Sequence, residues 1–352
     1  MTQRERMRHL RSPGLPDERL VADATNAFGL GSPLRLEPLT TGFMNRSWQA
    51  TTSAGTFAVK QTLDHSPEQA RRQHAVLDAL AARGFPAPIP LALPDGDTLL
   101  DHACGSFTLT PWMPGVLREG VDLAPAECTA AGHLLGELHH HLAAVLPPEP
   151  DTAVSHHREP ATDPRAALEA IDHYASLIEA RPVPDEFDEQ ARRMLRTRHE
   201  HITAQAHLRP LGSTWLGPYG WMHGDFQQFN LLWEHGRISA VLDWDRLCFG
   251  SLLGEVVRAA VFLFMNRERG NVDLDRVSAF IAGYRATRPV TEAQLVDAVH
   301  RWWWDYLCGL WPLDWHYDHG DTSCDQFFLA ASALLSWWYD HHDAAIESFT
   351  RP

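Results

Sequence analysis

The chain has 352 residues, 44% of them hydrophobic, and a formal net charge of −15. This length and composition predict a folded globular protein, and the acidic balance argues against a nucleic-acid partner, which needs clustered Lys and Arg. The five cysteines form no CxxC pair and no apolar run is long enough for a membrane span, which excludes a zinc ribbon and predicts a cytoplasmic protein without a membrane partner.

The first 110 residues predict strands and turns. Two strand-like runs, Ser47 to Thr52 and Thr56 to Leu63, flank the small turn residues 53–55. Alternation of β-branched and polar residues on either side of such a turn is typical of a β-hairpin.

A helix is expected after this hairpin, because Ser66 can cap it and Pro67 suits the first helical position. A short, proline-edged strand pair is then expected around the Asp95-Gly96 turn. Beyond residue 120 the apolar residues recur every three to four positions, which predicts a mainly helical region. The clearest helical segments are 124–146, 163–180 and 185–208.

The polar chemistry concentrates in residues 221–250, "WMHGDFQQFNLLWEHGRISAVLDWDRLCFG". Asp225 and Asn230 are five residues apart on an expected loop, and Asp243 ends a second apolar run eighteen residues after Asp225. Two short strands would bring these side chains together. Phosphoryl transfer needs a carboxylate beside the attacking hydroxyl and oxygen ligands for magnesium, and these residue types supply both.

A cation for the phosphates is available in "TFAVK", where Lys60 ends the strand. Strand alternation sends Ala58 and Lys60 to one face and Phe57 and Val59 to the other. The small side chain two residues before the lysine leaves room for a flat base.

"FAVK", "HGDFQQFN" and "VLDWD", in this order, resemble the aminoglycoside phosphotransferase and type II homoserine kinase family, which also includes choline kinases. The resemblance implies an α+β, bilobal protein-kinase-like fold, with an antiparallel sheet lobe carrying one helix and a larger, mainly helical lobe. It places the nucleotide-binding lobe at 1–110, the connector at 111–116, and the helical C-terminal lobe at 117–352 with its catalytic loop at 221–246.

The resemblance also implies roles for single residues. Asp225 would be the catalytic base, while Asn230 and Asp243 would hold Mg²⁺. Lys60 would contact the α- and β-phosphates of ATP or GTP. The other nucleotide contacts are expected at Ala58 and Leu232 on the two faces of the base, Pro111 and Met113 along its edge, and Gly42 in the phosphate loop.

Two departures from the family pattern concern the nucleotide site. The helix that usually carries a glutamate for the lysine has Gln73 and His74 at this place, so the partner of Lys60 is open. The phosphate loop has one glycine, Gly42, in place of a glycine-rich pattern. Asp245 is expected to be a solvated or capping carboxylate, and the alternative is a third metal ligand.

Seven of the thirteen tryptophans follow residue 300. They predict either an aromatic wall of an acceptor pocket or a helix packed on all sides, and both interpretations stay open. As acceptor contacts we consider Trp303, Asp305, Trp311 and Asp314.

The sequence therefore predicts a nucleotide- and Mg²⁺-dependent kinase for a hydroxyl of a small molecule. The first expectation is an antibiotic of aminoglycoside, peptide or nucleoside type, whose phosphorylation would give resistance. The alternatives are a metabolic kinase for homoserine, choline or a sugar, and an inactive kinase-like protein that binds ligand. A monomer or a homodimer is expected.

Overall fold

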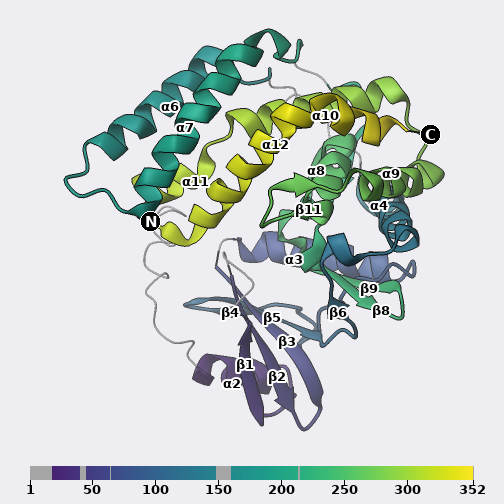
Figure 1. Ribbon diagram of the computed structural model, residues 1–352. Helices are drawn as coiled ribbons and strands as arrows, with labels where there is room; N and C mark the ends of the chain where they lie inside the picture. Colours follow the sequence, from purple (N-terminus) through teal and green to yellow (C-terminus); the bar gives the residue numbers. More distant parts are fainter. Residues whose placement is uncertain (1–17, 40–44, 64, 148–159, 213–214, 352) are drawn as a thin grey trace. The chain divides into compact units, whose positions relative to one another are not determined.

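Figure 1 shows the computed structural model of the chain, in which two compact units interleave along the sequence. The first unit consists of 1–118, 141–147 and 223–247, and the second of 119–140, 148–222 and 248–352. The lobe boundaries expected from the sequence stay a prediction. The residues that the structure describes are 18–39, 45–63, 65–147, 160–212 and 215–351.

A five-stranded antiparallel sheet organises the first unit, with strand order β1-β2-β3-β5-β4. Helix α2 (Glu18–Ala27) shares one hydrophobic core with the sheet, in which Val21 meets residues such as Trp48 and Leu109. The strands are β1 (Arg35–Leu39), β2 (Arg46–Thr52), β3 (Gly55–Thr62), β4 (Leu100–His102) and β5 (Gly105–Pro111). The sequence did not predict α2 or β1.

The expected hairpin and the helix after it are confirmed. β2 and β3 pair in antiparallel register, and Phe57 and Val59 are buried while Ala58 and Lys60 are half-buried. Helix α3 (Pro67–Ala81) begins after Ser66, whose side chain accepts the Gln69 N–H at 3.2 Å. The face of β3 that carries Lys60 is therefore the one that is not packed into the core.

The proline-edged strand pair was placed wrongly. The paired strands are β4 and β5, which are joined through residues 103–104, whereas Asp95 and Gly96 lie in a turn outside this ladder. Four prolines between positions 86 and 94 remove N–H donors from the earlier segment, so it cannot form a regular ladder.

A second, three-stranded sheet of the first unit has the order β6-β8-β9. It contains β6 (Val116–Leu117), β8 (Leu231–Glu234) and β9 (Arg237–Val241). The chain enters this sheet through β8, directly after Asn230, and leaves it through β9.

The second unit is mainly helical, and the three expected helices are confirmed. They are α4 (Pro125–Val145), whose residues from 141 on belong to the first unit, α6 (Pro164–Glu179) and α7 (Glu186–Gln205). Helices α6 and α7 lie side by side (Figure 1). No helix within the described residues is long and apolar enough to cross a membrane. The later elements are β7 (Tyr219–Met222), β10 (Cys248–Ser251), α8 (Leu252–Phe264), β11 (Met265–Asn266), β12 (Asn271–Val272), α9 (Leu274–Thr287), α10 (Glu292–Cys308), α11 (Trp311–Leu313), the π-helical turn Asp314–Asp318 and α12 (Asp325–Thr350).

Most of the late tryptophans build the core of this unit. Trp303 keeps 1% of its surface exposed, and Trp302, Trp304 and Trp338 are also buried. Trp302 on α10 lies 5.6 Å from Trp338 on α12, measured between ring centroids. Packing between α10 and α12 thus accounts for these rings, whereas Trp311 is 52% exposed.

Candidate active site

His223 and Gly224 shape the loop that presents Asp225. The buried His223 ring accepts the Asp225 N–H at Nδ1 (3.1 Å) and faces the Leu242 carbonyl with Nε2 (2.9 Å), so Nε2 carries the proton. Gly224 has a φ of +81°, and a Cβ there would lie 2.2 Å from the Arg246 carbonyl oxygen. The residues before Asp225 therefore tie its loop to the segment around Leu242.

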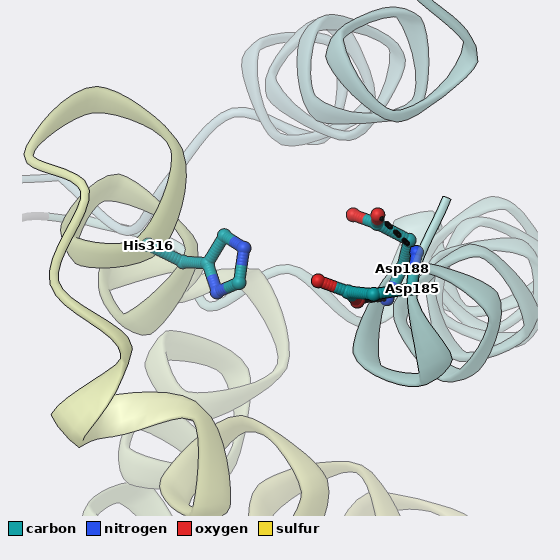
Figure 2. Close-up of side chains that lie close together, drawn as sticks. All are labelled: Asp185, Asp188 and His316. Atoms are coloured by element: carbon teal, nitrogen blue, oxygen red, sulfur yellow. Dashed lines mark hydrogen bonds between the residues drawn. The ribbon is translucent and has the colours of Figure 1, made fainter. Parts of the chain in front are cut away.

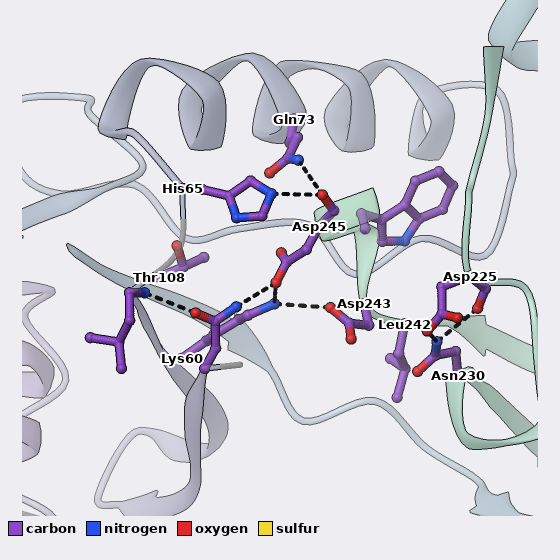
Figure 3. A network of polar contacts seen from close by, with 12 residues as sticks. Lys60, His65, Gln73, Thr108, Asp225, Asn230, Leu242, Asp243 and Asp245 are labelled. Atoms are coloured by element: carbon purple, nitrogen blue, oxygen red, sulfur yellow. Dashed lines mark hydrogen bonds and ion pairs between the residues drawn. The ribbon is translucent and has the colours of Figure 1, made fainter. Parts of the chain in front are cut away.

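Two amides hold the Asp225 side chain. Its Oδ2 accepts from Gln227 Nε2 at 2.8 Å. The same oxygen accepts from Asn230 Nδ2 at 2.9 Å (Figure 3). Asn230 Nδ2 also donates to the Asp225 carbonyl at 2.8 Å. Because the NH₂ of Asn230 faces Asp225, its carbonyl oxygen is the atom suited to a metal. The sequence did not single out Gln227.

Lys60 joins β3 to the second aspartate loop. Its Nζ lies 3.0 Å from Asp243 Oδ1 and 2.5 Å from Asp245 Oδ2 (Figure 3). Burial alone would lower the pKa of Lys60, but the two carboxylates raise it above its ordinary value. Burial would raise the pKa of Asp243, but Lys60 brings it below its ordinary value. Lys60 and Asp243 therefore stay charged at neutral pH.

Asp243 has an unusual backbone. Its φ is 56° and its ψ is 75°, a left-handed conformation that non-glycine residues seldom adopt. Such a conformation costs roughly 1–3 kcal/mol and persists where the surrounding structure fixes it, often at functional sites.

Asp245 is a second carboxylate partner of Lys60, beside Asp243. Its carboxylate also accepts from Asn45 Nδ2 at 2.6 Å, and its carbonyl is contacted by His65 Nε2 at 2.7 Å and by Gln73 Nε2 at 3.2 Å. The expectation of a solvated or capping carboxylate was wrong. Gln73 therefore hydrogen-bonds to the backbone of the residue whose carboxylate pairs with Lys60.

His74, the next residue of α3, is neutral. Its Nδ1 lies 2.8 Å from the Thr98 hydroxyl and its Nε2 lies 3.2 Å from the Thr108 hydroxyl. Burial, followed by the charge of Lys60, lowers the pKa of His74 to about 4. Helix α3 therefore brings no charge from this position to Lys60.

The remaining predicted nucleotide contacts lie in the first unit. Ala58 is half-buried on the same face of β3 as Lys60, and Leu232 is half-buried in β8. Pro111 ends β5 and is exposed, while Met113 is half-buried in the connector. Gly42 lies outside the described residues. Their nucleotide roles stay predictions.

The predicted acceptor residues lie in the second unit. Trp303 is enclosed in the core, so it offers no free ring face, and Trp311 is exposed. Asp305 is an exposed residue, although desolvation by the surrounding protein raises the pKa of its carboxyl to about 6. Asp314 is half-buried. The acceptor roles of these residues also stay predictions.

A group with metal-like spacing, Asp185, Asp188 and His316, lies in the second unit (Figure 2). Asp188 already accepts from Arg181 Nη1 at 2.9 Å and from the Tyr317 hydroxyl at 2.8 Å. Asp185 and Asp188 also form the capping box of α7. The guanidinium supplies the positive charge that a metal would bring, so this group is explained as structural.

Comparisons with known proteins agree with this geometry. The model of the phosphotransferase enzyme family matches residues 35–290. The homoserine kinase of Methylobacillus flagellatus is 25% identical over 264 residues, which is 75% of this chain and 74% of that protein.

Two solved structures show the same fold at low identity. A spectinomycin phosphotransferase in complex with ADP and spectinomycin has a TM-score of 0.64 and 14% identity, over 92% of this chain and 95% of that one. An amicoumacin kinase in complex with AMP-PNP, Ca²⁺ and Ami has a TM-score of 0.60 and 15% identity, over 94% of each chain. The kinase-like α+β fold is thereby confirmed.

The match to the family model covers most of the chain, including "FAVK", "HGDFQQFN" and "VLDWD". The chain belongs to the phosphotransferase enzyme family and is a small-molecule kinase that uses a hydroxyl group as acceptor.

Proposed function

We propose that the protein transfers the γ-phosphoryl group of ATP or GTP to a hydroxyl of a small molecule in a Mg²⁺-dependent reaction, with Asp225 as the base. The observation that carries this proposal is the fixed Asp225 carboxylate, held by Gln227 and Asn230 on a loop that His223 ties to the segment before Asp243. A carboxylate fixed in this way can orient an acceptor hydroxyl and take its proton.

The residues around Asp225 fit a magnesium ion. The amide oxygen of Asn230 and the carboxylate of Asp243 are hard oxygen ligands of the kind that Mg²⁺ prefers. When bound, the ion would neutralise charge on the β- and γ-phosphates. Asp243 Oδ1 lies 3.0 Å from Lys60 Nζ. The proposed metal ligand and the proposed phosphate-binding cation are therefore neighbours.

Lys60 would bind the α- and β-phosphates through its ammonium group. Its elevated pKa keeps the ammonium charged at neutral pH. Ala58 and Leu232 would contact the two faces of the base. The carbonyl of Pro111 and the N–H of Met113 would form hydrogen bonds with the edge of the base. Backbone groups are sufficient for this role.

For the acceptor we propose a small hydroxylated amine or amino acid of metabolism. The curated relatives that match in sequence are homoserine kinases. The interpretation of the late tryptophans as an aromatic wall of the acceptor pocket is weakened, because Trp302, Trp303, Trp304 and Trp338 are buried. A hydroxyl of an antibiotic is the second candidate, favoured by the exposed ring of Trp311.

A panel assay tests this proposal. The purified protein is incubated with ATP or GTP and Mg²⁺ and with homoserine, choline, 3-aminopropan-1-ol, aminoglycosides or nucleosides. We expect a phosphate mass increment on an amino alcohol or hydroxy amino acid, and none after chelation of the metal. An increment confined to the antibiotics would support the second candidate. Nucleotide binding without transfer to any acceptor would contradict the proposal.

A further inference from the structure

The two carboxylates that pair with Lys60 differ in how far the protein encloses them. Asp243 keeps 48% of its side-chain surface exposed, whereas Asp245 keeps 20%. The backbone of Asp245 is also fixed, because its carbonyl is contacted by His65 Nε2 and by Gln73 Nε2 (Figure 3). All five residues belong to the first unit. Asp243 is therefore the accessible carboxylate of the pair, and Asp245 is the one that the protein holds in place.

The amide of Asn45 connects Asp245 to the end of the strand that carries the lysine. Its Nδ2 donates to Asp245 Oδ2 at 2.6 Å, and its Oδ1 accepts the Leu63 N–H at 2.8 Å. Leu63 directly follows β3, and Asn45 directly precedes β2. Because the amide oxygen is used by a backbone donor, the NH₂ group must be the side that faces the carboxylate.

Lys60 and Asn45 share one oxygen of Asp245. Lys60 Nζ lies 2.5 Å from Asp245 Oδ2, the atom to which Asn45 donates. A carboxylate oxygen has two lone pairs, so it can accept both donors at once. Hydrogen bonds to an ionised acceptor are stronger than those between neutral groups. The position of this oxygen, and with it the position of the ammonium group, is thus set in part by Asn45.

A lysine that is held in place before the nucleotide arrives can bind phosphates more tightly. The side chain of a lysine is flexible, and fixing it on binding costs conformational entropy. If Asp243 were the single partner of Lys60, the lysine would compete with a metal ion for that carboxylate. The second partner, Asp245, keeps the ammonium group in place when Asp243 turns to the metal.

We propose that Asn45 is a positioning residue for nucleotide binding, which acts by holding Asp245 against Lys60. The inference rests on the proposed binding of the α- and β-phosphates by Lys60. Asn45 does not need to touch the nucleotide in this role, so its effect must pass through the carboxylate of Asp245.

A double-mutant cycle on nucleotide binding tests this route. Calorimetric titration of the full chain with ATP or GTP, in the presence of Mg²⁺ and without an acceptor, measures the dissociation constant. We expect Asn45→Ala to raise the constant about fivefold and Asp245→Ala to raise it about tenfold. In the Asp245→Ala background, Asn45→Ala should add less than about twofold, because the carboxylate through which it acts is already absent.

Gln61→Met is the matched control for a general loosening of the sheet. Gln61 is buried on the face of β3 opposite to Lys60, and its Nε2 donates to the Cys104 carbonyl at 2.8 Å. Its loss removes an amide-to-backbone hydrogen bond, as Asn45→Ala removes the bond to Leu63. Gln61→Met should lower the thermal midpoint and leave the dissociation constant within about twofold of the wild type.

Asn45→Leu repeats the test with a side chain of similar size, so that the result does not depend on the folding of Asn45→Ala. Three results would overturn the inference. These are an unchanged dissociation constant in the Asn45 variants, an equal loss of affinity in the wild-type and Asp245→Ala backgrounds, and an equal loss of affinity in Gln61→Met.

The titration also separates this inference from the proposed function. Because no acceptor is present, a failure of phosphoryl transfer would leave the dissociation constants and the cycle unchanged. A wild-type chain that binds neither ATP nor GTP would contradict both the inference and the proposed function.

Discussion

The polar loops of the first unit and the tryptophan-rich helices of the second are stabilised in different ways. Asp225, Asp243 and Lys60 are held by hydrogen bonds and ion pairs, and Asp243 keeps a strained backbone. Trp303 and Trp338 are held by close packing and keep almost no exposed surface. We therefore expect substitutions in the loops to reduce activity with little loss of stability. Substitutions of the buried helix residues are expected to reduce stability with little loss of activity.

Asp243→Asn should have the largest effect among the loop variants apart from Asp225. Removing a charged magnesium ligand is expected to lower kcat/KM by about 1,000-fold, because metal stabilisation is worth several kcal/mol. The thermal midpoint should change little. Steady-state kinetics across a magnesium titration measure the effect, and an unchanged magnesium requirement would refute the assignment.

Trp303→Leu should act on stability. Loss of a buried indole is expected to reduce the free energy of unfolding by about 3 kcal/mol, with the KM for the acceptor unchanged. Trp311→Leu is the matched variant at an exposed site and should cost less than about 0.5 kcal/mol. Denaturant unfolding and acceptor KM, measured on both variants, separate packing from substrate contact. A raised KM in Trp303→Leu alone would reverse our interpretation of the core.

His74 makes the stability of the first unit depend on pH. The pKa of His74 falls from 6.5 to about 4 on folding. Between these two pKa values the unfolded chain binds a proton that the folded chain does not bind. The free energy of unfolding is therefore expected to decrease by about 3 kcal/mol as the pH falls from about 6.5 to 4. Denaturant titrations over this range measure the slope. His74→Gln should flatten it, and an equal slope in that variant would assign the effect to other groups.

Asp245→Asn should have the smallest effect. Asp245 pairs with Lys60, and we propose that it positions this lysine without reacting itself, so its loss is expected to lower kcat/KM by about tenfold. The change should fall on the KM for the nucleotide more than on kcat. Asp101→Asn, which removes another carboxylate from a cation in the same unit, is the control and should leave the KM unchanged.

The sequence predicted those parts of the molecule whose signal is local. Hairpin β2-β3 and helix α3 follow from alternation and from the Ser66 cap. The turn of the β4-β5 pair was misplaced because Asp95-Gly96 is itself a sound turn signal. The contacts of Asp245 with Asn45 and Lys60 span 200 and 185 residues. No local pattern encodes such contacts, so the partner of Lys60 had to come from the structure.

The same distinction explains the tryptophans. Their density after residue 300 is visible in the sequence, but whether a ring faces solvent or a neighbouring helix depends on how α10 and α12 pack.

The most direct test of the proposed mechanism is Asp225→Asn, assayed for nucleotide binding and for phosphoryl transfer in the same preparation. The asparagine keeps an acceptor for Gln227 and Asn230 but cannot take a proton. We predict nucleotide binding within about twofold of the wild type and a kcat lowered by about 10²- to 10⁴-fold. Transfer that stays close to the wild-type rate would contradict the assignment of Asp225 as the base.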